Sequence, residues 1–170
     1  MGGRLVSVRD ERPGDAAGIR ELVREAFRLA EHSSGTEWKI VDALREAGAL
    51  TVSLVADDGD DLVGYVAVSP VAIDGAAGWH GLGPVAVVPE KQGKGIGSAL
   101  IEAALDRLKI SDASGCVVLG EPAFYARFGF SHDPVLSYAD VPPPYFQVRS
   151  FGPERPSGQV HYHPAFNTPP

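Results

Sequence analysis

The order of hydrophobic patterns along the chain predicts an α/β fold. Segments with strand and helix patterns alternate as strand, two helices, three strands, helix, strand, helix and strand. A glycine-rich turn connects one strand directly to an amphipathic helix, and a short buried strand follows that helix. The 170 residues are 44% hydrophobic, which suits one domain with its own core. These observations predict a single α/β domain over residues 1–170.

The first part of the chain is predicted to form one strand and two helices. Leu5 to Val8 begin a strand, and Pro13 suits the first turn of a helix that ends near Leu29. Ser34 and Glu37 match a capping box, which predicts that a second helix starts here. That helix presents an apolar face until a glycine ends it.

Three strands and a helix are predicted for the middle of the chain. Residues 51–56 and 62–73 are expected to pair as a hairpin around an acidic turn. Residues 79–88 form the strand that enters the glycine-rich turn. Apolar residues at helical spacing between 96 and 108 form the helix that leaves it, and their stripe should pack on the sheet.

The last third of the chain is predicted to contain shorter elements. The expected ranges are a buried strand at 116–119, a short helix at 122–127, a strand at 145–151 and a final strand at 160–162. Residues 140–144 are rich in proline and are expected to form a loop. The tail from about residue 164 is expected to be irregular.

Composition and charge argue against several classes of function. A formal net charge of −7 disfavours nucleic-acid binding, because phosphate contacts need a basic face. The longest apolar runs are far too short for a transmembrane helix, and the N-terminus lacks the apolar core of a signal peptide. The single cysteine, Cys116, excludes an internal disulfide. We therefore expect a cytoplasmic protein that binds neither nucleic acid nor membrane.

The stretch from Leu82 to Ser98 carries the strongest functional signal. Gly93, Gly95 and Gly97 alternate in the turn, and glycine lets a backbone adopt positive φ and approach a ligand closely. The helix after the turn begins with free N–H groups at the positive end of its dipole, and Lys94 adds a positive charge. Such a turn binds anions, and phosphate is the usual biological one.

The spacing within the turn distinguishes among phosphate-binding loops. The P-loop needs four residues between its first glycine and Gly-Lys-Ser/Thr, which this turn lacks, and the dinucleotide pattern would need a glycine at Ser98. The pattern that fits is Gln-x-x-Gly-x-Gly, at Gln92, Gly95 and Gly97. After a hydrophobic strand, this pattern resembles the coenzyme A pyrophosphate loop of the GNAT superfamily of N-acetyltransferases.

A second signature supports the same resemblance. Residues 124–130, Phe-Tyr-Ala-Arg-Phe-Gly-Phe, are similar to the Tyr-x-x-x-Gly-Phe ending of that family. Together with Leu-Gly-Pro-Val-Ala-Val before the loop and Val-Leu-Gly-Glu-Pro before Tyr125, they resemble the bacterial YhbS-like branch. The resemblance covers roughly the whole chain and is sharpest from Trp79 to Phe130. It implies a mixed, splayed β-sheet of about six to seven strands with helices on both faces.

The resemblance implies acetyl-coenzyme A as co-substrate and no metal. Backbone amides of the loop would hold the pyrophosphate, and an amide of the splayed strand would contact the thioester carbonyl. The residues implied in cofactor binding are Val85, Ala86, Val87, Gln92, Gly93, Lys94, Gly95, Ile96, Gly97, Ser98, Tyr125 and Phe128. The plainer alternatives are an ordinary strand-to-helix turn and an ordinary core strand.

Acid–base candidates follow from the chemistry of amide formation. The resemblance implies that Tyr125 is the general acid that protonates the coenzyme A thiolate, although the same ring could be a filler under the sheet edge. An amine with a pKa near ~10 must lose a proton before it attacks. The candidate bases are Glu37, His80, Glu121 and His32, and water could serve instead. Glu37 and Glu121 are equally explained as helix-capping residues.

The resemblance therefore implies an enzyme that transfers an acetyl group from acetyl-coenzyme A to a primary amine by direct attack in a ternary complex. The alternative is a non-catalytic module that binds or senses acyl-coenzyme A, and transfer of a longer acyl chain is a weaker one. The acceptor, a small-molecule or peptide amine, is expected between the loops at residues 32–36 and 133–144. The strand at 145–151 could pair across a dimer, so a monomer and a homodimer both stay open.

Overall fold

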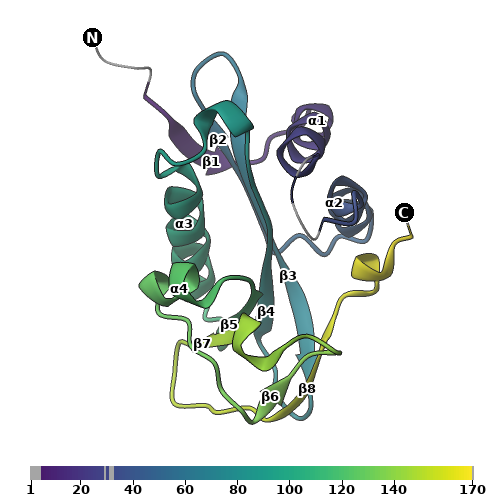
Figure 1. The fold of residues 1–170 in the computed structure, drawn as a ribbon, viewed down its shortest axis with the longest axis vertical. Helices are drawn as coiled ribbons and strands as arrows, with labels where there is room; N and C mark the ends of the chain where they lie inside the picture. Colours follow the sequence, from purple (N-terminus) through teal and green to yellow (C-terminus); the bar gives the residue numbers. More distant parts are fainter. Residues whose placement is uncertain (1–4, 29, 31–32, 170) are drawn as a thin grey trace.

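A mixed β-sheet with helices on both sides forms the frame of the molecule (Figure 1). The structure is a computed structural model and describes residues 5–28, 30 and 33–169. Its strands are β1 (Ser7–Asp10), β2 (Val52–Asp57), β3 (Leu62–Ile73), β4 (Trp79–Val87), β5 (Gly115–Leu119), β6 (Leu136–Ser137), β7 (Phe146–Ser150) and β8 (Gly158–Tyr162). Its α-helices are α1 (Ala16–Phe27), α2 (Glu37–Glu46), α3 (Ile96–Ile110) and α4 (Pro122–Tyr125). Short 3-10 turns are η1 (Pro89–Lys91), η2 (Ala126–Phe128), η3 (Pro143–Tyr145) and η4 (Pro164–Asn167). Within the described residues, no helix is both long and apolar enough to cross a bilayer.

The strand order brings distant parts of the chain together. Neighbouring strands follow the order β1-β2-β3-β4-β5-β7, and β8 pairs with the end of β3 and with β6. Pairs along the main path are antiparallel except for β4 and β5, which are parallel. Parallel neighbours need a crossover connection, and α3 supplies it. The glycine-rich turn therefore lies where β4 ends and this crossover helix begins.

Helices cover both faces of the sheet, as the resemblance implied. In Figure 1, α3 and α4 lie on one side of the strands and α1 and α2 on the other. The core on the α3 side includes Leu82, Leu100 and Val118, whereas Tyr65 belongs to the core under α1 and α2. Trp79 belongs to a third cluster, near β6 and β8. Each face of the sheet therefore buries its own set of alternate side chains.

The sheet contains one strand more than the roughly six to seven that were expected. The described residues form eight strands, and the unexpected one is β6, which contains only Leu136 and Ser137. Two residues carry no periodic pattern, so sequence alone does not reveal this strand. It exists because these residues pair in parallel with Gly158 and Gln159 of β8.

The predicted capping box before the second helix is wrong. α2 begins at Glu37 with Thr36 as its N-cap, and no side chain caps this end. The Glu37 carboxylate instead accepts a hydrogen bond from the Ser33 hydroxyl at 2.9 Å. The Ser34 hydroxyl pairs with the Thr36 hydroxyl, so it does not reach the helix N–H groups.

The C-terminal tail, which was expected to be irregular, forms a turn that packs on α2. The Ala165 N–H donates to His163 Nδ1 at 3.0 Å and starts η4. Ala165 is buried beside Ile40 and Leu44 of α2. The tail therefore connects the end of β8 to the helical layer on this face.

Candidate active site

The parallel strands β4 and β5 separate partway along their length. Their pairing runs from Trp79 opposite Gly115 to Leu82 opposite Val118. β4 continues to Val87 and stays paired with β3 to its end, whereas β5 stops at Leu119. The edge of β4 from Gly83 onward therefore faces a gap between the two strands. The splay that the resemblance implied is present.

The backbone of β4 turns alternate amides toward this gap. The Val88 N–H donates to the Val63 carbonyl of β3 at 3.0 Å, so it points away from β5. Because successive residues of a strand point to opposite edges, the amides of Val87 and Val85 point toward the gap. The gap thus has backbone hydrogen-bond donors along one wall.

Gln92 holds the glycine-rich loop against the end of β4, beside this gap. Its side-chain amide donates to the Val87 carbonyl at 3.0 Å, which ties the loop to the last residue of β4. In this structure, Gln92 therefore acts on the protein's own backbone. The sequence pattern assigned Gln92 to the loop, and the contact explains how its side chain holds the loop against the strand.

The loop presents the N-terminus of α3. Gly93 and Gly95 adopt left-handed conformations with φ of 77° and 85°, which glycine accepts without strain. The Ala99 N–H makes the first helical bond, to the Gly95 carbonyl at 3.0 Å. The amides of residues 96–98 precede that bond and are free for an anion. A Cβ at Gly95 would meet no atom within 4 Å, so the loop is open on this side.

Basic side chains flank a hollow beside the loop. The hollow has a volume of about 650 Å³ and lies between β1 and the first turn of α3. It is lined by Val6, Val8, Asp58, Lys91, Lys94, Gly95, Ile96 and Ala99. Ile96 is buried and anchors the start of α3 in the core. The N-terminal end of α3 is therefore fixed in place, with two lysines and one aspartate at its edge.

Tyr125 lies on the opposite side of the gap, just after β5. Pro122 begins α4, and Tyr125 ends it. The ring lies against Gly120, where an added Cβ would be 2.4 Å from Tyr125 Cε2. Edge-on contacts with Phe124 and Phe130, at ring-centroid distances of 5.0 and 6.0 Å, hold the ring. These contacts place the phenol beside the end of β5.

The environment of Tyr125 keeps its phenol protonated. Burial, and then the neighbouring Cys116 thiol, raise the pKa of Tyr125 to about 12. The following turn is anchored to β7, because the Arg149 guanidinium donates to the Phe128 carbonyl at 2.8 Å. Phe128 is buried and packs with Tyr125 rather than standing out into the gap. The phenol is thus a positioned hydrogen-bond donor.

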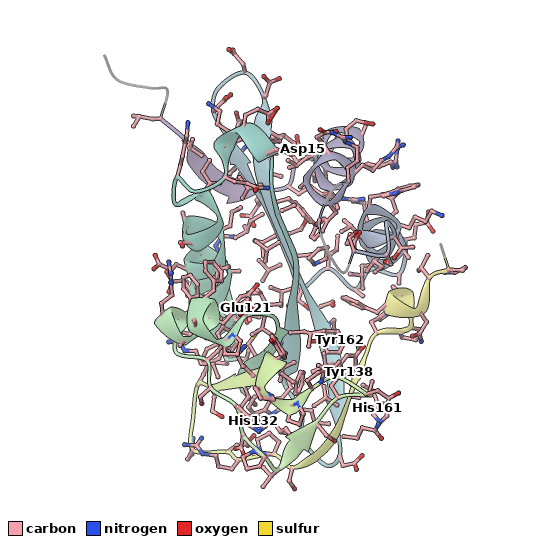
Figure 2. The ribbon with its side chains drawn as sticks, viewed as in Figure 1. Asp15, Glu121, His132, Tyr138, His161 and Tyr162 are labelled. Carbon is pink, nitrogen blue, oxygen red and sulfur yellow. The ribbon has the colours of Figure 1, made fainter. Side chains whose placement is uncertain are left out.

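The candidate bases lie in three separate places. His80 belongs to the paired part of β4, opposite Cys116, on the face that packs against α3. Burial lowers the pKa of His80, and a hydrogen bond with the Gly78 backbone opposes that effect. Glu121 is exposed and occupies the N-cap position of α4, beside which Figure 2 labels it, but its side chain makes no capping hydrogen bond, so the capping interpretation of Glu121 is wrong. His32 lies outside the described residues.

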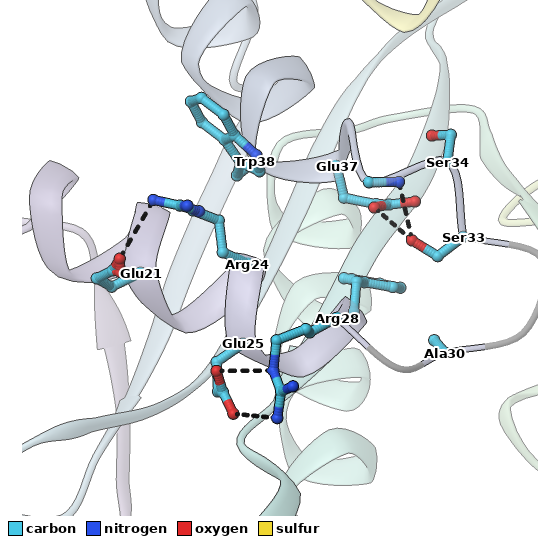
Figure 3. A pocket seen from close by; sticks show the side chains of 11 residues that line it. Glu21, Arg24, Glu25, Arg28, Ala30, Ser33, Ser34, Glu37 and Trp38 are labelled. Carbon is cyan, nitrogen blue, oxygen red and sulfur yellow. Dashed lines mark hydrogen bonds and ion pairs between the residues drawn. The ribbon is translucent and has the colours of Figure 1, made fainter. Parts of the chain in front are cut away.

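The remaining candidate, Glu37, lines a hollow between α1 and α2 (Figure 3). The hollow has a volume of about 660 Å³, and its lining comes from these two helices and the segment between them. The Trp38 ring faces the Arg24 guanidinium at 5.5 Å. The structure therefore does not gather Glu37, His80 and Glu121 around one point.

Two buried hydroxyls near the gap were missed by sequence reasoning. Ser69 Oγ and the Tyr162 hydroxyl are buried and have no hydrogen-bond partner among the described residues. The available signal was Gly81, because a glycine inside a strand often marks the close approach of another group. Among the described residues, no cluster of His, Cys, Asp and Glu could hold a metal ion.

Comparisons with known proteins agree with this geometry. A family model described as the acetyltransferase (GNAT) domain matches residues 50–132. The curated protein "Uncharacterized N-acetyltransferase YhbS" of Escherichia coli (strain K12) is 38% identical over 169 residues, which cover 94% of this chain and 98% of that protein.

Two solved structures are similar over nearly their whole length. One is a GNAT family acetyltransferase from Brucella melitensis in complex with acetyl-CoA, with 48% identity, a TM-score of 0.86, and coverage of 96% of this chain and 99% of that one. The other is YhbS from Escherichia coli in complex with CoA, with 36% identity, a TM-score of 0.89, and coverage of 99% and 95%. The chain therefore belongs to the GNAT family of acetyltransferases.

Proposed function

We propose that this protein transfers an acetyl group from acetyl-CoA to a primary amine by direct attack within a ternary complex. The observation that carries the proposal is the splay of β4 from β5, which opens directly beside the free amides at the start of α3. A thioester in the gap and a pyrophosphate on the loop suit these two features. The acetyl-CoA and CoA complexes of the two similar structures support this choice of cofactor.

The loop would bind the pyrophosphate through backbone amides. The N–H groups of residues 93–98 and the dipole of α3 favour an anion at this end. Lys94 is exposed at the rim and would add charge without defining geometry. The loop would therefore hold the cofactor in one register along β4.

The wall of β4 would stabilise the transition state. Attack of an amine on the thioester carbonyl places negative charge on its oxygen, and the amide of Val87 or Val85 points into the gap where that oxygen would lie. These amides belong to a strand that stays paired with β3, so they need no reorganisation during the reaction. Most of the rate enhancement would come from this orientation and electrostatic preorganisation.

Tyr125 would assist the departure of the coenzyme A thiolate. A phenol with a pKa of about 12 is a weaker acid than a thiol with a pKa near ~8.5. Tyr125 would therefore donate a hydrogen bond to the sulfur and release its proton only as negative charge develops there. This role requires position rather than acidity, and the contacts with Phe124 and Phe130 supply it.

Direct attack is favoured over an acyl-enzyme route. The thiol of Cys116 is fully buried in β5, and burial raises its pKa well above the usual range. A neutral buried thiol is a poor nucleophile. The amine would therefore attack the acetyl group of bound acetyl-CoA without an intermediate on this residue.

The proposal is tested by calorimetric titration with acetyl-CoA of the parent protein and of Gly95→Glu. The substitution introduces a negative charge where the pyrophosphate would bind. It also places a residue with a side chain at a backbone position of positive φ, which such residues adopt only with strain. We expect binding by the parent and a loss of affinity of about ten-fold or more for the variant, the effect of about 1.4 kcal/mol. Gly75→Glu is the matched control, since Gly75 also has positive φ and open space around it but lies in the distant β3–β4 turn.

The same titration distinguishes the outcomes. Absence of acetyl-CoA binding by the parent, or equal binding by Gly95→Glu, would overturn the assignment of the loop. If binding is confirmed, CoA release in the presence of a panel of primary amines tests the transfer itself. Binding without release for any amine would favour a module that only binds acyl-CoA.

A further inference from the structure

The segment that carries Tyr125 is too short to fix the phenol by itself. α4 contains only four residues, and η2 adds a single 3-10 turn before the chain turns back at Gly129. A helix of about one turn orders several residues for very few internal hydrogen bonds, so it is stable only when other parts of the protein hold it. The position of the phenol therefore depends on contacts between this segment and neighbouring elements.

Two side chains of β7 hold the segment, one on each side of α4. The Gln147 side-chain amide donates to the Gly120 carbonyl at 3.1 Å, just before the helix begins. The Arg149 guanidinium donates to the Phe128 carbonyl at 2.8 Å, where η2 ends. Alternate residues of one strand therefore hold the backbone before and after the tyrosine.

Strand register places both side chains on the face that carries α4. β7 pairs with β5 so that Gln147 lies opposite Val118 and Arg149 lies opposite Cys116. Paired residues share a face of the sheet, and Val118 and Cys116 belong to the core on the α3 side. Tyr125 packs against this same core. Figure 1 shows α4 beside the end of the sheet that β5 and β7 form.

The first of these bonds fixes the glycine that supports the ring. Gly120 lies so close to Tyr125 that an added Cβ would overlap the ring, so a shift of this backbone would move the phenol. Gln147 is only 2% exposed, and a buried amide is unfavourable unless it is hydrogen-bonded. An apolar side chain of similar size would fill the same space without that cost. The bond to Gly120, rather than packing, therefore explains a glutamine at this place.

The second bond fixes the chain after α4. Arg149 is itself held in place, because its guanidinium lies over the Phe151 ring at 5.5 Å. It also packs against Gly129, where an added Cβ would lie 3.2 Å from Arg149 Nε. Main-chain hydrogen bonds in both directions between Ser131 and Val148, at 2.8 and 3.0 Å, continue the attachment to β7. Both ends of the segment are therefore tied to one strand of the sheet.

We propose that Gln147 and Arg149 are positioning residues that set the Tyr125 phenol at the gap between β4 and β5. The inference rests on the proposed acetyl transfer and on the part of Tyr125 in it. A proton donor with a pKa of about 12 depends on alignment with the leaving sulfur. A displacement of about 1 Å in an active site can cost about 100-fold in rate. The two side chains act through the backbone on either side of α4, without contact with acetyl-CoA.

A double-mutant cycle tests this role. We would measure kcat for the parent, Gln147→Met, Tyr125→Phe and the doubly substituted protein, with an amine found in the CoA-release panel. Methionine resembles glutamine in size but cannot donate to the Gly120 carbonyl. Gln147→Met should lower kcat by about 10-fold in the parent but by less than about two-fold in Tyr125→Phe, because no hydroxyl is then left to misplace.

Affinity for acetyl-CoA should be the same in Gln147→Met and in the parent, so the loss should appear in kcat alone. An equal loss of kcat with and without the Tyr125 hydroxyl would show a general structural effect. That result would overturn the positioning role of Gln147.

The residue at the other end of the segment supplies an independent test. Arg149→Met leaves the Phe128 carbonyl without its donor and should lower kcat by about 10-fold. Arg149→Lys keeps a donor and should restore most of the activity. Equal kcat values for these two variants would overturn the role of Arg149. Circular dichroism shows whether each variant is folded, and the Arg149 pair decides the question if Gln147→Met does not fold.

Crystal structures of the parent and of Gln147→Met test the position of the phenol without an acceptor. We expect the Tyr125 hydroxyl to move by about 0.5 Å or more, the tolerance of a functional site. An unchanged ring would overturn the proposal. Gln159→Met is the matched control, since Gln159 is exposed on β8 and the same substitution there should change neither the ring position nor kcat.

The outcomes separate this inference from the proposed function. If no amine releases CoA, or if Tyr125→Phe keeps the kcat of the parent, the part of Tyr125 in the reaction fails and the inference falls with it. If Tyr125→Phe lowers kcat and Gln147→Met lowers it equally in both backgrounds, the acetyl transfer stands and only the positioning role fails.

Discussion

Two aromatic rings near the gap lie against glycines. Tyr125 rests on Gly120, and Tyr162 rests on Gly81, so that an added Cβ would be within 3.0 Å of each ring. Each glycine lies in or directly after a strand, and neither has positive φ. Space for the ring, rather than backbone freedom, therefore requires glycine at both positions. The two rings can pack on opposite faces of the sheet near the end of the β4–β5 pairing because Gly120 and Gly81 have no side chains in their way.

Removal of the Tyr125 hydroxyl tests its proposed role in thiolate departure. We expect Tyr125→Phe to lower kcat by about 10- to 100-fold, because the leaving sulfur loses its proton donor. Acetyl-CoA affinity should not change, since the ring and its packing remain. Activity of the parent should not fall through ionisation of Tyr125 between pH 6 and 10, because its pKa is about 12. CoA release under steady-state conditions and calorimetry give the two quantities.

Tyr145→Phe is the control for this change. Tyr145 is exposed and lies at the end of η3, so loss of its hydroxyl should leave kcat as in the parent. An unchanged kcat in Tyr125→Phe would show that the phenol is only a packing group. Weaker acetyl-CoA binding in that variant would instead place the hydroxyl on the cofactor before the reaction.

A half-buried polar network connects four elements near the first residues of β2. The Glu11 carboxylate, just after β1, accepts two hydrogen bonds from Arg45 of α2, at 2.8 and 2.9 Å, and one from Ser53 of β2, at 2.7 Å. The Ser53 hydroxyl also bonds with the Tyr65 phenol of β3 at 2.8 Å. Arg45 bonds in addition with Asp42 at 3.1 Å. The network fixes α2 against three strands.

Substitution of the carboxylate tests this network through pH. Burial raises the pKa of Glu11, but hydrogen bonds from Arg45 and Ser53 outweigh this effect and leave the pKa below its usual value of 4.5. An acid with a lowered pKa adds stability above its unfolded pKa and loses it as pH falls. We expect Glu11→Gln to lower the free energy of unfolding by about 2 kcal/mol at pH 7, because it leaves a partly buried Arg45 without its partner.

The difference between Glu11→Gln and the parent should begin to shrink as pH falls below about 4.5, where the carboxylate of the unfolded chain takes up a proton, and should vanish once pH passes the lower pKa of the folded state. Urea denaturation at several pH values measures this difference in the free energy of unfolding. Glu21→Gln is a suitable comparison, since the Glu21–Arg24 pair is mostly exposed and should contribute little. A pH-independent difference would show that packing, rather than charge, accounts for the effect.

At the scale of the whole molecule, the C-terminal turn joins the helical layer to the aromatic group near β8. Ala165 packs on Ile40 and Leu44, and the Phe166 ring meets Tyr162 edge-on at 5.0 Å. This segment bridges α2 and β8 without touching the loop at the start of α3. Stability and cofactor binding should therefore respond differently to its removal.

Deletion of residues 164–170 should lower stability and leave acetyl-CoA binding intact. The lost burial of Ala165 and Phe166 is worth about 2 kcal/mol, which for a chain of this size corresponds to a fall in Tm of about 4–8 °C. Circular dichroism measures Tm, and calorimetry measures the affinity. A chain truncated after Thr168 keeps the turn and should behave as the parent. A large loss of acetyl-CoA affinity with unchanged Tm would contradict the prediction that the tail contributes to stability and not to cofactor binding.

Short-range features of the site were predictable because neighbours along the chain create them. The glycine-rich turn after a strand, with Gln92 and Gly95, and the signature around Tyr125 are continuous in sequence. The elements that carry them begin and end within one or two residues of the predicted positions. Periodicity and turn chemistry are local properties, so sequence patterns report them well.

The separation of β4 from β5, by contrast, depends on registers between strands that α3 keeps far apart in the chain. The same holds for the placement of His80 on the α3 face and for the approach of the Tyr162 ring to Gly81. Sequence by itself determined the α/β order, the glycine-rich turn and the phenol after β5, because each follows from adjacent residues. Only the tertiary structure decided which groups share the gap, because strand pairing and packing choose among faces that the local pattern leaves equivalent.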